Sequence, residues 1–148
     1  MEYLIKENVL YRNNNFLKEK ISEDHFIINK KEEYAGSHIL LDLWNTEFNN
    51  SIKFLKKIMR ESINVSGATL LHMHLHRFGK EQGISGVAIL AESHISVHTW
   101  PERNFLAFDI FMCGDTKPEL AAKYLIQTLN PKKKILKLIK RGVKKRVK

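Results

Sequence analysis

The sequence predicts an α+β fold, a two-layer α/β sandwich in which helices cover one face of an antiparallel sheet. Three observations support this prediction. The chain has 148 residues, 43% of them hydrophobic, which suits one globular domain with a single core. Apolar residues recur at spacings of three and four in two segments, as in helices with one buried face. Strand-like stretches joined by short links lie between those segments, and short links favour antiparallel pairing.

The first part of the predicted sandwich is a strand followed by a helix. Residues 38–44 are apolar enough for a strand, and Asn45 or Thr46 can cap the helix that follows. The apolar stripe of that helix comprises Phe48, Ile52, Leu55, Met59 and Ile63. We expect the helix to end before Gly67.

The second part contains the remaining strands and a second helix. Strands are predicted over residues 68–76, from a turn at 83–86 through 91, over 95–100, and over 105–113. Asp115 or Thr116 can cap the second helix, and Asn130 followed by proline ends it. Its expected buried positions are Leu120, Tyr124 and Leu125. A final short strand is predicted over 135–139.

Charge and composition divide the chain into an N-terminal extension (1–35), a domain (36–142) and a basic tail (143–148). The net charge of +9 comes from the C-terminal end, because residues 131–148 hold ten Lys and Arg and no acid. The rest of the chain is nearly neutral, so we interpret the tail as a solvated terminus. A nucleic-acid-binding module is an alternative that depends on this tail alone, since the strands lack interleaved basic and aromatic residues.

The sequence shows no membrane span and no signal peptide, and its single cysteine cannot form an intrachain disulfide. The longest apolar run, residues 86–91, is far shorter than a membrane span, and the first residues show no signal-peptide pattern. We therefore expect a cytoplasmic protein without a membrane partner. The lone Cys113 cannot form an intrachain disulfide, so it is either a small buried residue or a reactive thiol.

Three histidines alternate along one predicted strand. His72, His74 and His76 would point to one face, a spacing that a metal ion could use. No nearby carboxylate completes a ligand set, and a ladder of solvated histidines explains the pattern equally well. We therefore predict no metal site.

The residues most able to take part in a reaction lie in or near the segment 91–102. Ser93 lies at a bend between two strands, His98 follows five residues later, and Cys113 ends the next strand. Antiparallel neighbours can bring such residues together. A nucleophile, a proton carrier and a thiol acid could thus share one pocket, and the alternative is that they are ordinary strand residues, because Ser and His are common on solvated faces.

The same segment resembles the self-processing motif of the bacterial and archaeal S-adenosylmethionine decarboxylases. The resemblance rests on Glu92-Ser93-His94 followed by His98-Thr99-Trp100-Pro101-Glu102. It extends to Gly36, His38, His76-Arg77-Phe78, Gly83-Ile84-Ser85-Gly86, Phe108-Asp109-Ile110-Phe111 and Cys113-Gly114, and covers roughly residues 36–140. The loop from Phe78 to Gly83 departs from the family, which more often has a shorter link containing proline.

The resemblance implies a proenzyme that cleaves itself between Glu92 and Ser93 into fragments 1–92 and 93–148. Ser93 would become a covalent pyruvoyl group, and neither pyridoxal phosphate nor a metal would be needed. His98 would accept a proton during processing, which Ser85 would assist. Cys113 would be the proton donor in catalysis, after the pyruvoyl ketone has formed a Schiff base with the substrate.

The substrate implied by the resemblance is S-adenosylmethionine, and the product is the aminopropyl donor for spermidine synthesis. Phe78 and Trp100 are candidates to stack on adenine, and Glu102 to accept hydrogen bonds from the ribose. The resemblance also implies a homodimer with active sites near the subunit contacts. The same scaffold could instead decarboxylate ornithine or arginine, an alternative that Trp100 and Glu102 disfavour.

Overall fold

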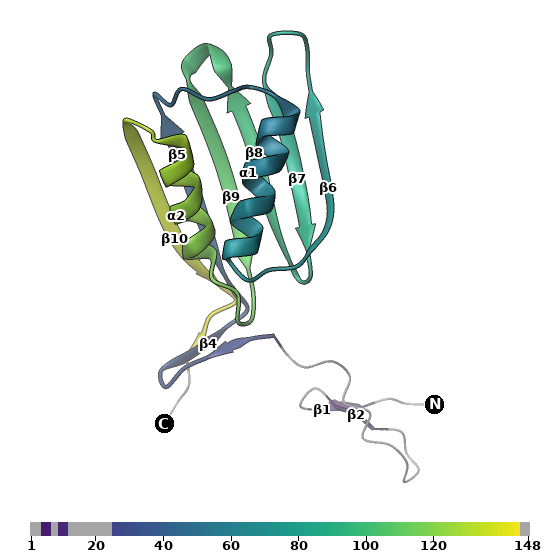
Figure 1. Ribbon diagram of the computed structural model, residues 1–148. Coiled ribbons are helices and arrows are strands. Elements are labelled where there is room, and N and C mark those ends of the chain that lie inside the picture. The colour runs from purple at the N-terminus through teal and green to yellow at the C-terminus, as the bar shows by residue number, and fades with distance from the viewer. Residues whose placement is uncertain (1–3, 7–8, 12–24, 146–148) are drawn as a thin grey trace.

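Two helices lie side by side across one face of a six-stranded antiparallel sheet (Figure 1). The computed structural model describes residues 4–6, 9–11 and 25–145, the first two ranges as backbone only. The strand order is β10-β5-β9-β8-β7-β6. The strands are β5 (Gly36–Trp44), β6 (Leu70–Arg77), β7 (Ile84–Leu90), β8 (Ser93–Trp100), β9 (Phe105–Met112) and β10 (Lys133–Arg141), and the helices are α1 (Ile52–Val65) and α2 (Pro118–Leu129). The predicted two-layer α+β sandwich is confirmed.

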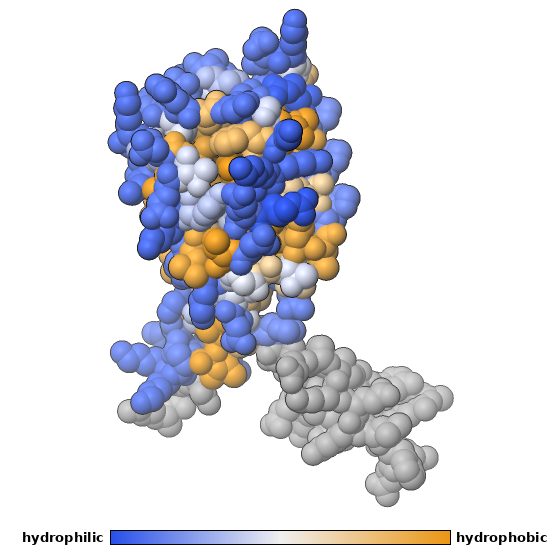
Figure 2. Space-filling view, viewed as in Figure 1, coloured by the Kyte–Doolittle hydropathy of each residue, from blue (hydrophilic) through white to orange (hydrophobic). Residues whose placement is uncertain are grey.

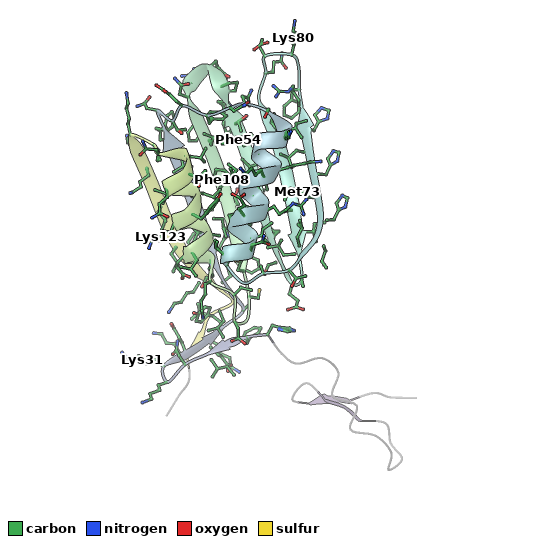
Figure 3. All side chains as sticks on the ribbon, in the orientation of Figure 1. Lys31, Phe54, Met73, Lys80, Phe108 and Lys123 are labelled. Atoms are coloured by element: carbon green, nitrogen blue, oxygen red, sulfur yellow. The ribbon has the colours of Figure 1, made fainter. Side chains whose placement is uncertain are left out.

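Alternation along the strands separates a buried face from an open face. In β8 the side chains at 93, 95, 97 and 99 are buried, while those at 94, 96, 98 and 100 lie on the side away from the helices. Phe108 of β9 is buried between sheet and helices, whereas Lys80 and Lys123 extend outward (Figure 3). The apolar core fills this layer, and the open face has no covering element among the described residues.

Helix α1 begins later than the sequence predicted. Its N-cap is Ser51, whose hydroxyl accepts a hydrogen bond from the Phe54 amide at 3.1 Å. Asn45 instead adopts a left-handed conformation with φ 53°, and Thr46 donates its hydroxyl proton to the Leu129 carbonyl. The prediction of Asn45 or Thr46 as the cap was therefore wrong, because both residues serve the link between β5 and the helices.

Helix α2 also differs from its predicted cap and buried face. Lys117 occupies the N-cap position without a side-chain hydrogen bond, and Thr116 donates to the Cys113 carbonyl at 2.7 Å. Leu120 is 45% exposed, so its predicted burial was wrong. The residues that α2 buries are Pro118, Ala121, Ala122, Leu125 and Leu129. Small alanines let α2 pack closely on the sheet. A pattern of large apolar residues does not reveal this contact.

The strand positions were largely predicted, with shifted ends. Strand β9 ends at Met112 rather than at 113, and β10 spans nine residues rather than the predicted five. All nine residues of β10 are exposed, and this edge strand holds four lysines and one arginine among its apolar residues. Charged side chains on an edge strand oppose pairing with other chains.

A second, smaller sheet joins the segment that precedes β5 to the segment that follows β10. Strands β3 (Ile27–Ile28), β4 (Glu32–Tyr34) and β11 (Lys144–Lys145) pair antiparallel in the order β11-β4-β3. Figure 1 shows this sheet beyond the lower end of the sandwich. The predicted extension and basic tail thus share a sheet, whereas residues 12–24 and 146–148 lie outside the described residues. Strands β1 (Leu4–Lys6) and β2 (Val9–Tyr11) form a separate antiparallel pair.

The surface is hydrophilic over much of the helix-covered face (Figure 2). Within residues 25–145, neither helix is long and apolar enough to cross a membrane.

Candidate active site

Glu92 occupies a strained position in the turn between β7 and β8. Leu90 pairs with Ser93, so only Ala91 and Glu92 connect the strands. Glu92 has φ 68°, a left-handed conformation that two-residue hairpins favour but that glycine or asparagine normally adopts. A glutamate held here stores backbone strain next to Ser93, at the bond predicted to be cleaved.

Ser93 and Cys113 lie in contact beside this turn. Ser93 is 9% exposed, and its Oγ accepts a hydrogen bond from the Cys113 amide at 3.2 Å. Burial, and secondarily the charge of Glu92, raises the pKa of the Cys113 thiol. A side chain at Gly36 would bring a Cβ within 2.9 Å of Cys113 Sγ and 2.6 Å of the Met112 carbonyl oxygen. Glycine at 36 therefore leaves the room that the thiol occupies.

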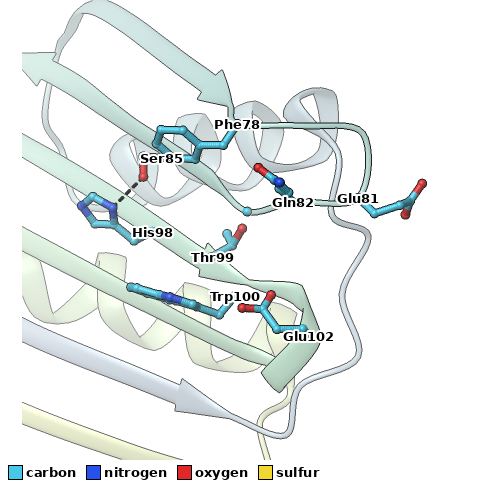
Figure 4. Close-up of a pocket in the computed structure, with 9 residues that line it drawn as sticks. Phe78, Glu81, Gln82, Ser85, His98, Thr99, Trp100 and Glu102 are labelled. Atoms are coloured by element: carbon cyan, nitrogen blue, oxygen red, sulfur yellow. Dashed lines mark hydrogen bonds between the residues drawn. The ribbon is translucent and has the colours of Figure 1, made fainter.

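Ser85 and His98 form a second cluster on the open face. These residues are direct partners in the pairing of β7 and β8, and Ser85 Oγ lies 2.7 Å from His98 Nδ1 (Figure 4). The short separation marks a hydrogen bond between hydroxyl and imidazole. The predicted proton carrier and the serine predicted to assist it are thus adjacent.

A pocket of about 520 Å³ adjoins that cluster, and all three predicted substrate-binding residues line it. Its lining comprises Phe78, Glu81, Gln82, Gly83, Ser85, His98, Thr99, Trp100 and Glu102 (Figure 4). Thr99 Oγ1 accepts a hydrogen bond from the Ile84 amide at 2.9 Å and fixes the pocket loop to the end of β8. Phe78 lies in the pocket despite the unusual loop from 78 to 83, although its side chain is 63% exposed.

The two clusters lie apart within one chain. Ser93 begins β8 at the lower end of the sheet, whereas the pocket lies at the other end (Figures 1 and 4). Five residues separate Ser93 from His98, about 16 Å along a strand. An odd spacing also places their side chains on opposite faces. A single chain therefore does not bring the nucleophile and the proton carrier into one pocket, which the sequence had left as a possibility.

The alternating histidines lie on the open face of edge strand β6. His72, His74 and His76 pair with Ile89, Val87 and Ser85 of β7. Among residues 25–145, no group of three His, Cys, Asp or Glu side chains has the geometry to hold a metal ion. The His76 ring instead contacts Phe78 edge-on, with ring centroids 5.2 Å apart.

A polar cluster at the centre of the open face was missed by the sequence analysis. His38 Nε2 lies 3.4 Å from Asp109 Oδ1, and Ser96 donates to Asp109 Oδ2 at 3.2 Å. Burial, and secondarily the neighbouring His38, lowers the pKa of His94. The period-2 alternation of these residues was the available signal, since it places all four on one face.

Comparison with known proteins places a chain with this sandwich, turn and serine beside a thiol among the decarboxylases. The sequence profile described as S-adenosylmethionine decarboxylase matches residues 37–142. The chain is 40% identical over 116 residues to the S-adenosylmethionine decarboxylase proenzyme of Brevibacillus brevis, covering 75% of this chain and 86% of the relative. It is 43% identical over 110 residues to the proenzyme of Prochlorococcus marinus, covering 72% and 87%.

A solved structure agrees with the sequence relatives. The crystal structure of adenosylmethionine decarboxylase from Aquifex aeolicus superimposes with a TM-score of 0.68 at 31% identity, covering 74% of this chain and 92% of that chain. The protein belongs to the S-adenosylmethionine decarboxylase family. The profile starts at residue 37, so it leaves out the whole of the predicted extension.

Proposed function

We propose that the chain is a proenzyme that cleaves itself between Glu92 and Ser93 and then decarboxylates S-adenosylmethionine. The observation that carries this proposal is the turn at Glu92, with φ 68°, directly before Ser93, whose hydroxyl accepts the Cys113 amide. The membership of the family supports the substrate.

Self-cleavage needs only groups of the chain and one water. The Ser93 hydroxyl adds to the Glu92 carbonyl carbon, and the peptide C–N bond breaks as an ester forms. Loss of the Ser93 Cα proton to His98 then breaks the Cβ–O bond and releases Glu92 as a carboxylate. The resulting dehydroalanine tautomerises to an imine, which water hydrolyses to the pyruvoyl group and ammonia. The adjacency of nucleophile and carbonyl in the chain gives the first step a high effective concentration.

Two copies of the chain complete one site in this proposal. The open face exposes apolar side chains without a covering element in the described part, among them Val87 and Ile89 of β7 and Trp100 of β8. Apolar area of this kind is characteristic of subunit interfaces. A second copy packed on the open face can supply Ser85 and His98 to the Ser93 of the first, and the separation of the two clusters within one chain supports this arrangement. We therefore propose a homodimer.

The pocket residues suit a nucleoside. Trp100 stacks on Phe105 with ring centroids 5.1 Å apart, and Phe105 stacks on Trp44 at 4.0 Å, so Trp100 presents a preorganised ring. Phe78 offers a second aromatic surface for adenine, and the Glu102 carboxylate can accept hydrogen bonds from ribose hydroxyls.

Decarboxylation requires an electron sink and a proton donor. Ser93 and its surroundings fit a pyruvoyl group, because the residue is buried and hydrogen-bonded beside a thiol. When present, the ketone withdraws electrons from the substrate α-carbon as carbon dioxide leaves. Cys113 then returns a proton to that carbon, and its raised pKa keeps the thiol protonated at neutral pH. The product is proposed to donate aminopropyl groups for spermidine synthesis in the cytoplasm.

Intact mass and release of labelled carbon dioxide test this function. Wild type is expected to separate into fragments 1–92 and 93–148, whereas Ser93→Ala stays whole; Ser96→Ala, on the same strand, is the matched control and cleaves. Labelled carbon dioxide is expected from S-adenosylmethionine and not from ornithine or arginine, since a site with unpaired ribose acceptors rejects shorter substrates by ~10⁴-fold. An uncleaved wild type refutes the pyruvoyl mechanism, and faster release from ornithine or arginine refutes the substrate.

A further inference from the structure

The N-terminal segment contacts the cleavage site from outside the family domain. His25 Nδ1 lies 3.1 Å from Glu92 Oε2, and the His25 carbonyl accepts a hydrogen bond from the Gly114 amide at 3.1 Å. One residue therefore contacts both the turn before Ser93 and the loop after Cys113. The family profile starts at residue 37, so nothing in it accounts for this contact.

The segment that carries His25 is attached to the domain by the small sheet. Strand β3 begins two residues after His25 and pairs with β4, which pairs with β11 near the C-terminal end. Two ion pairs reinforce the attachment, Lys144 to Glu33 at 3.4 Å and Lys140 to Glu32. The Ala35 amide also donates to the Arg141 carbonyl at 2.8 Å. His25 is thus held by the domain.

The contacts bear on the geometry that self-cleavage needs. Glu92 occupies a backbone conformation that residues with a side chain rarely adopt, so contacts to its carboxylate favour that conformation. The Gly114 amide follows Cys113, whose own amide donates to Ser93 Oγ. Through its side chain and its carbonyl oxygen, His25 therefore contacts the residue whose carbonyl would be attacked and the loop next to the amide that donates to Ser93 Oγ.

We propose that His25 is a positioning residue for self-cleavage, so that the segment before the family domain takes part in maturation. The inference rests on the proposed cleavage between Glu92 and Ser93. His25 does not touch the reacting atoms, and it acts by holding the Glu92 side chain and the 113–114 loop in fixed positions relative to each other. Both side chains of this contact are about half exposed, at 47% and 54%, so its contribution is modest.

The rate of self-cleavage of newly synthesised full-length chain tests the role. His25→Ala is expected to cleave about two- to fivefold more slowly than wild type, the range for a partly exposed polar contact between side chains. His25→Asn is expected to restore most of the rate, because its side-chain amide nitrogen replaces Nδ1 as donor. Lys30→Ala is the matched control, since it removes a charge from the same segment, and it is expected to cleave at the wild-type rate.

A double-mutant cycle separates positioning from a general structural role. In a Glu92→Ala background the loss on His25→Ala is expected to shrink, because the side-chain acceptor of the His25 contact is already gone. Melting of the uncleavable Ser93→Ala chain, with and without His25→Ala, checks that the fold is kept. Equal rates for wild type and His25→Ala, a His25→Asn variant as slow as His25→Ala, or an undiminished loss in the Glu92→Ala background each overturn the role of His25. A wild type that never cleaves overturns the proposed function itself.

Discussion

Two cleavage-defective chains are expected to repair one another if each site is shared between two copies. Ser93→Ala lacks the nucleophile, and His98→Ala lacks the proton acceptor. In a mixed dimer one site combines Ser93 of the second variant with His98 of the first and is intact, while the other site carries both defects. Each variant alone is expected to remain uncleaved.

The magnitude follows from the symmetry of a dimer. When equal amounts of the two chains are refolded together, about half of the dimers contain one of each. About half of the His98→Ala chains are then expected to be cleaved, and none of the Ser93→Ala chains. A mass tag on one variant lets a denaturing gel assign the fragments.

The structure makes this outcome specific. The spacing of about 16 Å and the opposite faces of β8 prevent Ser93 from reaching His98 of its own chain. Absence of fragments in the mixture, with mixed dimers present, would show that a chain folds both groups into one site. Cleavage of His98→Ala alone would remove His98 from the proposed role.

Three further predictions concern single residues. Phe108→Ala is expected to lower the free energy of unfolding in urea by about 3–5 kcal/mol, because it empties the layer between sheet and helices; a loss below about 1 kcal/mol contradicts that packing. The pKa of His94 is lowered in the fold, so the unfolded chain binds a proton before the folded chain does as the pH falls. The contribution of His94 to stability is therefore complete above the pKa of an ordinary histidine and is lost as the pH falls below it. His94→Gln is expected to flatten the decline between pH 7.5 and 5.5 measured by urea unfolding, and an unchanged slope counts against this assignment. The raised pKa of Cys113 predicts alkylation at higher pH than for a free thiol, and Glu92→Gln in the Ser93→Ala chain is expected to move that pH downward.

Apolar periodicity predicted the architecture well because the core imposes it. Every second residue of β8 and β9 is buried, and α1 buries residues spaced by three and four, so sequence pattern and burial coincide. The helix caps were missed because several polar residues precede each helix, and only the tertiary path selects one. Ser51 caps α1 because Asn45 and Thr46 are needed where β5 turns toward the helices.

The candidate site was located by its motif, but its division into two clusters was not foreseen. The signal was present, since a spacing of five along a strand places Ser93 and His98 on opposite faces. The contact of His25 could not be predicted, because it depends on the pairing of β4 with β11 from the far end of the chain. Such long-range pairing leaves no local pattern in a sequence.

Cleavage after Glu92 would also change how the protein refolds after denaturation. Fragment 1–92 supplies β5, β6 and β7, and fragment 93–148 supplies β8, β9 and β10. In the sheet, β5 lies between β10 and β9, so the two fragments interdigitate and neither holds a contiguous half of the sheet. Refolding of a cut chain needs its other fragment from solution, so even the formation of one protomer depends on concentration, whereas an uncut protomer folds as a single chain. Cleavage at this position would make denaturation at low concentration hard to reverse. The rate of unfolding would then set the stability of the mature enzyme.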